Sequence, residues 1–458
     1  MLSLKLSDIA MWTKGSLRGA DVEVRGVFTD TRVPQPGGLF IALAGEHFDA
    51  HEFVGAAKHA GAAAALVARP VDVDLPQVVV VDTLLALGDL ASAVRAPRRT
   101  RVVGITGSNG KTTVKTLLAS ILALHGKTHV NAGNFNNEVG LPLSILTMPE
   151  DADFAVLEMG AGKPGDIAYL AAIARPEIGL VNNIAPAHLE RMGTLEGIAE
   201  TKGAIYAALP PQGVAVVNAD DAFAALFTNS AGARRVLRFG LEQPADVCGE
   251  IRVAGAQSQF TLILPDGRAD IALPLAGRHN VMNALAAATI AHALDVPIAT
   301  IKRGLEGAAP VAGRFIRHVM AGGWSLIDDS YNANPGSTAA AISTLTAEPG
   351  DHWLVLGDMR ELGAGAAALH AQIGTLAREH GIARLFTVGE LAAAATQAFG
   401  KNAVHFVDQS ALIAALVADV RPGVGVLVKG SRGSRMDRVV RALLGSANGN
   451  GGGARHAA

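Results

Sequence analysis

Short hydrophobic runs alternate with longer alanine-rich stretches along most of the chain. The runs at 154–158 (FAVLE) and 178–184 (IGLVNNI) show no alternation of apolar and polar residues. Such runs are typical of strands in a parallel sheet that helices cover on both faces. A strand–loop–helix pattern at 101–115 (RVVGITGSNGKTTVK) precedes them, with a helix expected from Lys111 to about Leu124. The pattern predicts an α/β fold built on a parallel sheet.

Two further segments flank this region. In the first, β-rich runs come before a helix-like stretch at 51–68 and a second helical stretch that ends at Arg95. From about Val311, strand-like runs recur between alanine-rich stretches, the pattern of a doubly wound α/β domain. We therefore expect domains at 1–96, 97–310 and 311–445, followed by a low-complexity, disordered tail at 446–458.

Composition limits the cellular compartment and the kinds of partner that we expect for the protein. The chain has 458 residues, of which 50% are hydrophobic and only 4% aromatic, so Ala, Val, Leu and Ile must build the cores. A formal net charge of −2 gives no basic surface for nucleic acid. We find neither an apolar run of the ~20 residues that cross a bilayer nor a signal-peptide hydrophobic region. Cys248 is the only cysteine, which excludes intrachain disulfides. These features predict a cytoplasmic protein without nucleic-acid partners or membrane insertion.

The segment 104–115 has the character of a phosphate-binding loop but departs from the generic pattern. A Walker A loop requires glycine, four residues, then Gly-Lys-Ser/Thr, and this chain has Ile105 at the first position. Because a strand leads into the loop and Lys111 opens a helix, backbone N–H groups would face phosphate oxygens. Lys111 would add a point charge, and the Thr112 hydroxyl could bind Mg²⁺. The alternative is a glycine-rich turn with a surface lysine, and the strand–loop–helix context favours phosphate binding.

Polar residues follow the next two strands of the predicted sheet. Glu158 ends one strand and His188 comes soon after the other. Because the carboxyl ends of parallel strands form one rim, both side chains are expected near the loop, where they could hold Mg²⁺. Taken singly, Glu158 could be a salt-bridged surface acid and His188 an ordinary loop histidine. Lys202 alone would be a solvated helix lysine.

Further polar motifs occur later in the chain. A helix predicted at 276–294 places Asn280 and Asn283 three residues apart, on one face. Asn280 could cap the helix, which leaves Asn283 unexplained. Four other motifs lie just beyond strands or at the edge of the third segment: GRF (313–315), DDSYNANP (328–335), GDMRELG (357–363) and VKGSR (428–432).

Taken in order, these motifs resemble those of the Mur ligase family. The resemblance spans nearly the whole chain, from TDTRVPQPGG at residue 29 to LVKGSR at residue 432. Glycines at 104, 107 and 110 before Lys111 match the loop that this family uses. The stretches NAGNFNNEVGLPLSIL, LEMGAGKPGDIAYL and NNIAPAHLERMG resemble the member that acts on UDP-MurNAc-tripeptide and D-Ala-D-Ala.

The resemblance implies three domains: a small mixed α/β domain that binds the UDP-sugar, a central P-loop ATPase-like domain and a C-terminal Rossmann-like domain. The residues implied for ATP binding are Gly107, Ser108, Asn109, Gly110, Lys111, Thr112, Thr113, Asn280, Asn283, Arg314, Asp329, Asn332 and Asn334. Those implied for substrate binding are Thr31, Arg32, Asp49, His51, Asn134, Asn137, Lys429, Ser431 and Arg432, the last three for the incoming dipeptide.

The resemblance also implies two Mg²⁺ ions, held by Thr112, Glu158, His188 and Lys202 as its carbamate. Carbamylation would convert a cation into an oxygen ligand for a hard metal. Many family members have a glutamate two residues after this lysine, whereas this chain has Ala204. The catalytic residues implied are Lys111, Glu158, His188, Lys202 and Arg314.

The implied reaction is ATP-dependent amide formation through an acyl phosphate, carried out by a monomer. Closure of the third domain would keep water from that intermediate. Three alternatives stay open. The ligase that adds the third amino acid carries an Asp-Asn-Pro-Arg motif, which is absent here. A folylpolyglutamate synthetase would leave residues 1–96 without a role. A non-catalytic, nucleotide-gated binding protein could dispense with Glu158, His188 and Lys202, yet all three are present.

Overall fold

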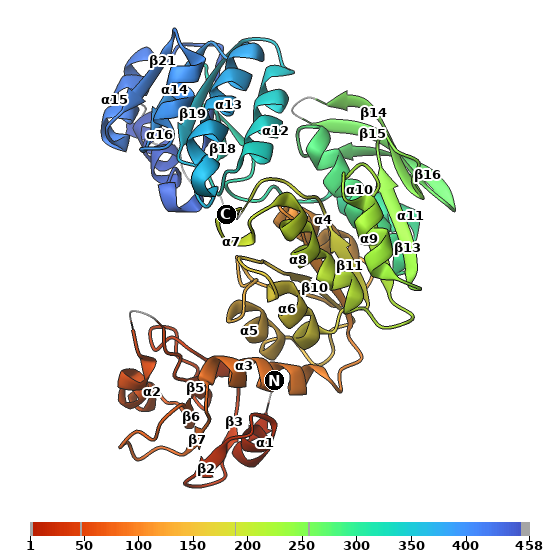
Figure 1. Cartoon of the computed structure of the whole chain (residues 1–458), viewed down its shortest axis with the longest axis vertical. Coiled ribbons are helices and arrows are strands. Elements are labelled where there is room, and N and C mark those ends of the chain that lie inside the picture. The colour runs from red at the N-terminus through yellow and green to blue at the C-terminus, as the bar shows by residue number, and fades with distance from the viewer. Residues whose placement is uncertain (1–2, 46–47, 188, 255–256, 450–458) are drawn as a thin grey trace.

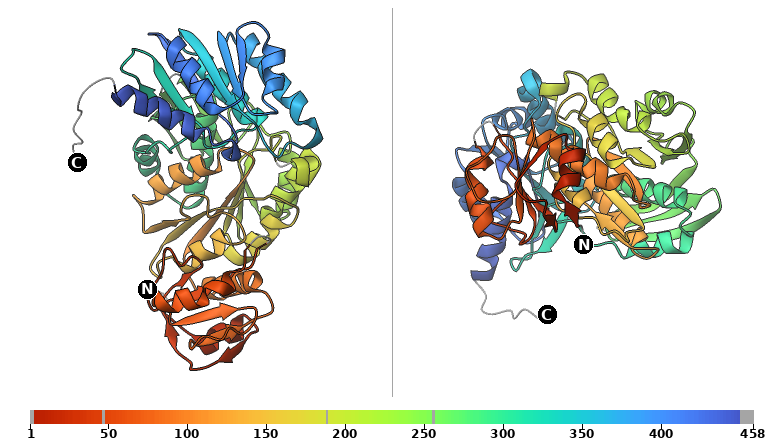
Figure 2. Two further views of the ribbon diagram at one scale, coloured as in Figure 1. Left: turned by 90° about the vertical axis from the view of Figure 1, so that its left-hand side faces the viewer. Right: turned by 90° about the horizontal axis from the view of Figure 1, so that it is seen from below.

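The computed structural model describes residues 3–45, 48–187, 189–254 and 257–449. Three sheets follow one another along an elongated molecule, with the N-terminal segment at one end and the C-terminal segment at the other (Figures 1 and 2). The sheets have five, nine and six strands and are mostly parallel. The predicted α/β fold class is confirmed. Within the described residues, no helix is both long and apolar enough to cross a membrane.

The first sheet has the strand order β2-β7-β6-β5-β4, and β1 pairs separately with β3. The strands here are β1 (Leu4–Lys5), β2 (Ser16–Arg18), β3 (Glu23–Val24), β4 (Val27–Phe28), β5 (Leu39–Ile41), β6 (Ala64–Val67) and β7 (Gln77–Val79). The helices are α1 (Leu6–Trp12), η1 (Ala50–Phe53), α2 (Val54–His59) and α3 (Thr83–Arg95).

The prediction of one helix over 51–68 is wrong in its second half. Helix α2 ends at His59, and Gly61 follows with a φ of +91°, a conformation that suits glycine. The chain then enters β6, all four residues of which are buried between β5 and β7. A strand buried on both faces has a continuous apolar pattern, and alanines in such a strand read as helix in the sequence.

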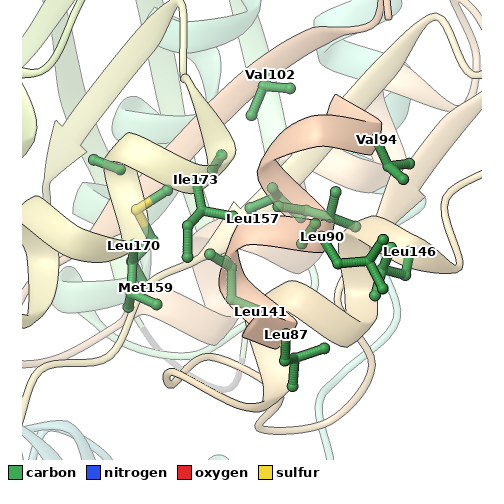
Figure 3. Close-up of a cluster of buried hydrophobic side chains, with 14 of the residues drawn as sticks. Leu87, Leu90, Val94, Val102, Leu141, Leu146, Leu157, Met159, Leu170 and Ile173 are labelled. Atoms are coloured by element: carbon green, nitrogen blue, oxygen red, sulfur yellow. The ribbon is translucent and has the colours of Figure 1, made fainter. Parts of the chain in front are cut away.

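Helix α3 joins the first domain to the second through a shared core. Figure 3 shows its side chains, together with those of the central segment, in one apolar cluster. The labelled residues are Leu87, Leu90 and Val94 of α3, Val102, Leu141 and Leu146, Leu157 and Met159, and Leu170 and Ile173. Because residues of both segments exclude water from one another, the first domain is packed firmly against the central one.

The central sheet has the order β16-β15-β14-β13-β12-β11-β8-β10-β9, in which β8 to β14 run parallel with one another. Its strands are β8 (Arg101–Thr106), β9 (Thr128–Val130), β10 (Phe154–Glu158), β11 (Ile178–Val181), β12 (Val214–Asn218), β13 (Arg235–Gly240), β14 (Val247–Ala254), β15 (Ser258–Leu264) and β16 (Gly267–Leu273). Its helices are α4 (Lys111–Leu122), α5 (Gly140–Leu146), α6 (Asp166–Ala174), α7 (Leu189–Met192), α8 (Leu195–Ala207), α9 (Ala224–Ala231), α10 (Arg278–Ala293) and α11 (Ile298–Glu306). The antiparallel extension formed by β14, β15 and β16 was not predicted.

The third sheet has the order β17-β18-β22-β19-β20-β21, with only β17 antiparallel to its neighbour. Its strands are β17 (Ile316–Val319), β18 (Ser325–Asp329), β19 (Asp351–Gly357), β20 (Arg384–Val388), β21 (Ala403–Phe406) and β22 (Val424–Lys429). Its helices are α12 (Pro335–Thr346), η2 (Gly363–Gly365), α13 (Ala366–Glu379), α14 (Ala393–Phe399), α15 (Gln409–Asp419), η3 (Arg432–Ser434) and α16 (Asp437–Gly449). Helix α16 continues into the segment predicted to be a tail, and residues 450–458 lie outside the described part.

Arg95, the last residue of α3, fastens the connection between the first two domains. It is 5% exposed, and burial lowers its pKa. Its Nε donates to the Ala174 carbonyl at 2.9 Å, Nη1 to Arg98 O at 2.9 Å and Nη2 to Thr100 O at 3.1 Å. One guanidinium at the end of the first domain therefore satisfies carbonyl oxygens of the linker and of the central domain.

We predict that Arg95→Met lowers the free energy of unfolding by about 2–4 kcal/mol, because buried carbonyls lose their charged donor. Urea denaturation followed by circular dichroism measures this. Arg99→Met is the matched control, since Arg99 is exposed on the same linker. Equal stability of the two variants would contradict the role given to Arg95.

Candidate active site

The loop between β8 and α4 can be formed only with glycine at its end. Gly110 has a φ of +79° and is the N-cap residue that precedes α4. A Cβ there would lie 2.3 Å from Asn283 Oδ1 and 2.5 Å from Asn182 Nδ2. Asn182 Nδ2 donates to the carbonyl of Asn109 and to Asn283 Oδ1, both at 2.9 Å. Asn283 in turn donates to Asn280 Oδ1 at 3.1 Å. Asn283 thus supports the loop through Asn182, and Asn280 holds Asn283 in place.

Lys111 is half-buried, with its side chain folded back against the loop that it follows. Its Nζ donates to Gly107 O at 2.7 Å and to Ser108 O at 3.3 Å. Burial lowers the pKa of Lys111, and the Glu158 carboxylate acts against that shift. The lysine therefore occupies the concave side of the loop, in the position from which it can contact a phosphate.

Glu158 ends β10 with its side chain buried, at 3% exposure. Its Oε2 accepts from Thr112 Oγ1 and its Oε1 from Asn136 Nδ2, each at 2.8 Å. Burial acts to raise the pKa of Glu158, but the nearby Lys111 and Lys115 ammonium groups outweigh it, so the pKa lies below its usual value. Glu158 is thus held ionised beside the phosphate loop.

Lys115 was not predicted as a site residue. It is 5% exposed, with its Nζ 3.6 Å from Glu158 Oε2. The same Nζ donates to Asn131 O at 2.9 Å and to Gly133 O at 3.3 Å. It therefore ties α4 to residues 131–137, which we call the asparagine loop. The available signal was its spacing, four residues after Lys111 on one helix face.

Lys202, on α8, is buried rather than solvated, at 1% exposure. Burial and the charge of Lys111 lower its pKa to about 7, with Asp166 acting in the opposite direction. Within the described chain, its ammonium group forms no ion pair or side-chain hydrogen bond. His188, the other residue expected at this rim, lies outside the described residues.

The oxygen donors at the loop suit a metal that arrives with phosphate. In the described part of the chain, no three His, Cys, Asp or Glu residues gather as a ready metal cluster. Thr112 Oγ1 and Glu158 Oε2 are 2.8 Å apart and are hard oxygen donors. Mg²⁺ typically takes one or two carboxylates and fills its remaining positions with water and substrate phosphates. The residues present therefore fit Mg²⁺ bound together with a nucleotide.

Two cavities meet at the phosphate loop. The first has a volume of about 580 Å³ and is lined by Asn280, Asn283, Asp329 and Lys429 among others. The second, of about 420 Å³, lies on the Lys111 and Glu158 side. The residues that line both are Asn109, Gly110, Arg314 and Ser337. The loop and Arg314 therefore stand at the junction of two compartments.

The C-terminal domain reaches the phosphate loop through Asn334. This residue caps α12 by accepting from Ser337 N at 2.9 Å. Its Nδ2 donates to Asn109 Oδ1 at 2.7 Å, across 225 positions of sequence. The predicted ATP-site residues of two domains are therefore in direct contact. Asn332 lines the second cavity, and its Oδ1 accepts from Arg432 N at 3.3 Å.

The three residues suggested for the dipeptide differ in their availability. Lys429 forms a buried pair with Asp329, 2.5 Å between Nζ and Oδ2, and also donates to Asn332 O. Ser431 donates to Ala333 O at 3.1 Å and accepts from the Arg360 amide at 2.8 Å. Lys429 and Ser431 thus maintain the domain itself, whereas the Arg432 side chain reaches into the second cavity.

The substrate residues predicted in the first domain lie away from both cavities. Asp49 Oδ1 binds His51 Nδ1 at 2.5 Å, and His51 Nε2 accepts from the Ala68 amide at 2.7 Å. Since His51 is buried, this chain of bonds holds the domain together. Thr31 and Arg32 lie on a turn where Arg32 pairs with Asp30. Of the predicted substrate residues in the central domain, Asn134 and Asn137 do line the second cavity.

We predict that Gly110→Ala abolishes nucleotide binding, because the added methyl group would collide with Asn182 and Asn283. Isothermal titration with ATP measures this. Gly133→Ala is the control: Gly133 also has a positive φ, +49°, but nothing within 4 Å of an added Cβ. It should lose only the strain of roughly 1–2 kcal/mol in stability. Normal ATP affinity in Gly110→Ala would refute the steric argument.

Comparison with known proteins places this geometry in a family. Residues 105–291 match the Mur ligase middle domain, and residues 313–432 match the Mur ligase glutamate ligase domain. The UDP-N-acetylmuramoyl-tripeptide--D-alanyl-D-alanine ligase of Escherichia coli (strain K12) is 45% identical over 448 residues, which cover 97% of this chain and 99% of that protein. The Bacillus subtilis (strain 168) protein of the same name is 35% identical over 459 residues, with the same coverage.

Solved structures support the same family assignment. A crystal structure of MurF from Acinetobacter baumannii superimposes with a TM-score of 0.92 at 35% identity, covering 97% of this chain and 99% of that one. MurF ligase from Thermotoga maritima in complex with ADP gives a TM-score of 0.82 at 29% identity, with 92% and 97% covered. The resemblance read from the motifs is confirmed, and the chain belongs to the Mur ligase family.

Proposed function

We propose that this protein joins D-Ala-D-Ala to UDP-MurNAc-tripeptide with ATP, releasing UDP-MurNAc-pentapeptide, ADP and phosphate. The observation that carries the proposal is the pair of cavities that share the phosphate loop and Arg314. One compartment can take a nucleotide while the other takes the group that receives its phosphate. The full-length match to the Escherichia coli ligase supports the choice of substrates.

The nucleotide base and ribose occupy the first cavity in this proposal, with the phosphates at the loop. The Thermotoga maritima MurF ligase was crystallised in complex with ADP, which supports a nucleotide on this fold. Lys111 exchanges its bonds to the loop carbonyls for bonds to phosphate oxygens. Because the lysine is half-buried, its charge is less screened than in bulk water and acts more strongly on a triphosphate.

Phosphoryl transfer takes place where the cavities meet. An oxygen of the tripeptide's terminal carboxylate bonds to the γ-phosphorus, and the bond to ADP breaks, which gives an acyl phosphate. Lys111 and Arg314 orient the γ-phosphate. Thr112 and Glu158, with His188 and carbamylated Lys202, are the residues that would hold Mg²⁺. Bound metal supplies positive charge that offsets the repulsion between carboxylate and triphosphate.

Amide formation follows in the second cavity. The amine of D-Ala-D-Ala attacks the acyl carbonyl, the bond to phosphate breaks, and the amine loses its proton. Arg432 binds the dipeptide carboxylate, since its side chain reaches this cavity. Asn134 and Asn137 contact the tripeptide side, and Thr31 and Arg32 contact the UDP-sugar. The Asn109–Asn334 bond helps to keep water from the acyl phosphate.

The environment of Lys202 suits carbamylation. CO₂ reacts with a neutral amine, and a pKa of about 7 leaves a substantial neutral fraction near neutral pH. The carbamate would be an anion close to Lys111, whose charge disfavours the ammonium form but stabilises an anion. Its oxygens would be hard ligands of the kind that Mg²⁺ prefers.

The first test is turnover by purified protein with ATP, Mg²⁺ and UDP-MurNAc-tripeptide, with and without D-Ala-D-Ala. We expect ADP release to depend on the dipeptide, with pentapeptide product detected by mass spectrometry. Lys111→Ala should reduce turnover by roughly 10³-fold or more, since buried electrostatic stabilisation is lost.

Calorimetry should find UDP-MurNAc-tripeptide still bound by Lys111→Ala. The exposed Lys127→Ala variant is the control and should turn over normally. Binding of UDP-MurNAc-tripeptide without any turnover by the unmodified protein would instead favour a sister ligase with another acceptor, or the non-catalytic alternative.

We predict that Lys202→Ala loses most activity and that added short carboxylates such as acetate partly restore it by replacing the carbamate oxygens. With ¹³C-labelled bicarbonate, the unmodified protein should show a carbamate carbon signal that Lys202→Ala lacks. Full activity in Lys202→Ala, or identical spectra for both proteins, would exclude the modification at this lysine.

A further inference from the structure

Two arginine side chains lie against the ring of Tyr331. The Arg314 guanidinium is 4.3 Å from the ring centroid, and the Arg432 guanidinium is 5.4 Å from it. Arg432 Nη1 also donates to the Tyr331 hydroxyl at 3.2 Å. Tyr331 follows β18, Arg314 precedes β17 and Arg432 begins η3. Three separate segments of the C-terminal domain thus converge on one half-buried ring.

Within the described residues, neither Arg314 nor Arg432 forms an ion pair with a carboxylate. Several other arginines of the C-terminal domain, such as Arg317 and Arg384, pair with carboxylates. Arg314 Nε is buried and has no hydrogen-bond partner in the part of the chain that the structure describes. Both side chains line the second cavity, and Arg314 also lines the first. Two uncompensated guanidinium groups at the wall of a cavity favour anionic ligands.

The backbone fixes the ring beside Arg314. The Tyr331 amide donates to Gly313 O at 3.2 Å. Gly313 has a φ of +70°, and a Cβ at this position would be 3.1 Å from Tyr331 Cβ. Only a glycine therefore lets the segment carrying Arg314 lie directly against Tyr331. The contact between the arginine and the ring follows from this backbone packing.

Two like charges on one wall repel each other, so something must set their separation. The electron-rich face of an aromatic ring attracts guanidinium groups. We propose that Tyr331 is a positioning residue that holds Arg314 at the junction of the cavities and Arg432 at the acceptor end. Arg314 then meets the transferring phosphate and Arg432 the acceptor carboxylate. This inference rests on the proposed function, which it deepens by naming what spaces the two anion sites.

The ring and the hydroxyl of Tyr331 have different partners, which makes the proposal testable. The hydroxyl contacts Arg432, whereas the ring contacts both arginines. Tyr331→Phe should raise the KM for D-Ala-D-Ala about 3- to 10-fold, with kcat and the KM for ATP unchanged, since one hydrogen bond to a charged group is lost. Tyr331→Leu should raise the same KM further and also lower kcat, because Arg314 loses its support.

An acceptor that lacks the carboxylate distinguishes a loss of arginine positioning from general structural damage. The unmodified protein should prefer D-Ala-D-Ala to its C-terminal amide, and Tyr331→Leu should lose part of that preference, as should Arg432→Met. In a double-mutant cycle, the effects of Tyr331→Phe and Arg432→Met on the KM for D-Ala-D-Ala should be less than additive. A merely structural defect would not selectively change discrimination between dipeptide and amide.

Tyr169→Phe is the matched control, because the buried Tyr169 hydroxyl has no hydrogen-bond partner among the described residues and lies outside both cavities. Thermal melting checks that each variant is folded. Unchanged kinetic constants and acceptor preference in folded Tyr331→Leu would overturn the proposal. If Tyr331→Leu does not fold, additive effects in the cycle would overturn it. Absence of turnover by the unmodified protein would instead count against the proposed function, so the two failures are distinguishable.

Discussion

A carboxylate buried in a protein stays ionised only where cations and hydrogen-bond donors are held against it. Glu158 imposes that constraint on the site at the phosphate loop. Its three partners come from two places: Thr112 and Lys115 on α4, and Asn136 on the asparagine loop. Asn131 adds two bonds to the Glu158 backbone, accepting from its amide and donating to its carbonyl. The need to satisfy one carboxylate therefore fixes a helix, a strand end and a loop relative to one another.

This arrangement is electrostatically unfavourable for the lysines around Glu158. Lys111, Lys115 and Lys202 all have pKa values lowered by burial. Like charges in a buried site destabilise the folded protein, and one carboxylate cannot neutralise all of them. An arriving triphosphate would relieve that repulsion. Relief of this repulsion would favour the binding of an anion, and a local conflict of this kind is expected at functional sites.

The features that could be predicted from the sequence are those that depend on a local pattern of residues. Continuous apolar runs located β8, β10 and β11, and glycine spacing located the loop, because both follow from backbone geometry. Lys115 was missed because nothing local separates a buried helix lysine from a solvated one. The Asn109–Asn334 contact joins residues 225 positions apart, and pairing at that distance is decided by tertiary packing. The bonds of His51 to Asp49 and to the Ala68 amide within the first domain likewise depend on tertiary packing and could not be predicted from the sequence.

The two domain boundaries differ in kind, which indicates where the molecule can move. A single hydrophobic cluster runs from the first domain into the central one, and Arg95 seals their junction. Within the described residues, no such cluster spans the central and C-terminal domains. They meet through polar contacts such as Asn334 to Asn109 and Thr344 to His279. Polar contacts exchange readily with water, whereas separating a shared core exposes apolar surface. Substrate entry should therefore open the second boundary while the first two domains move as one body.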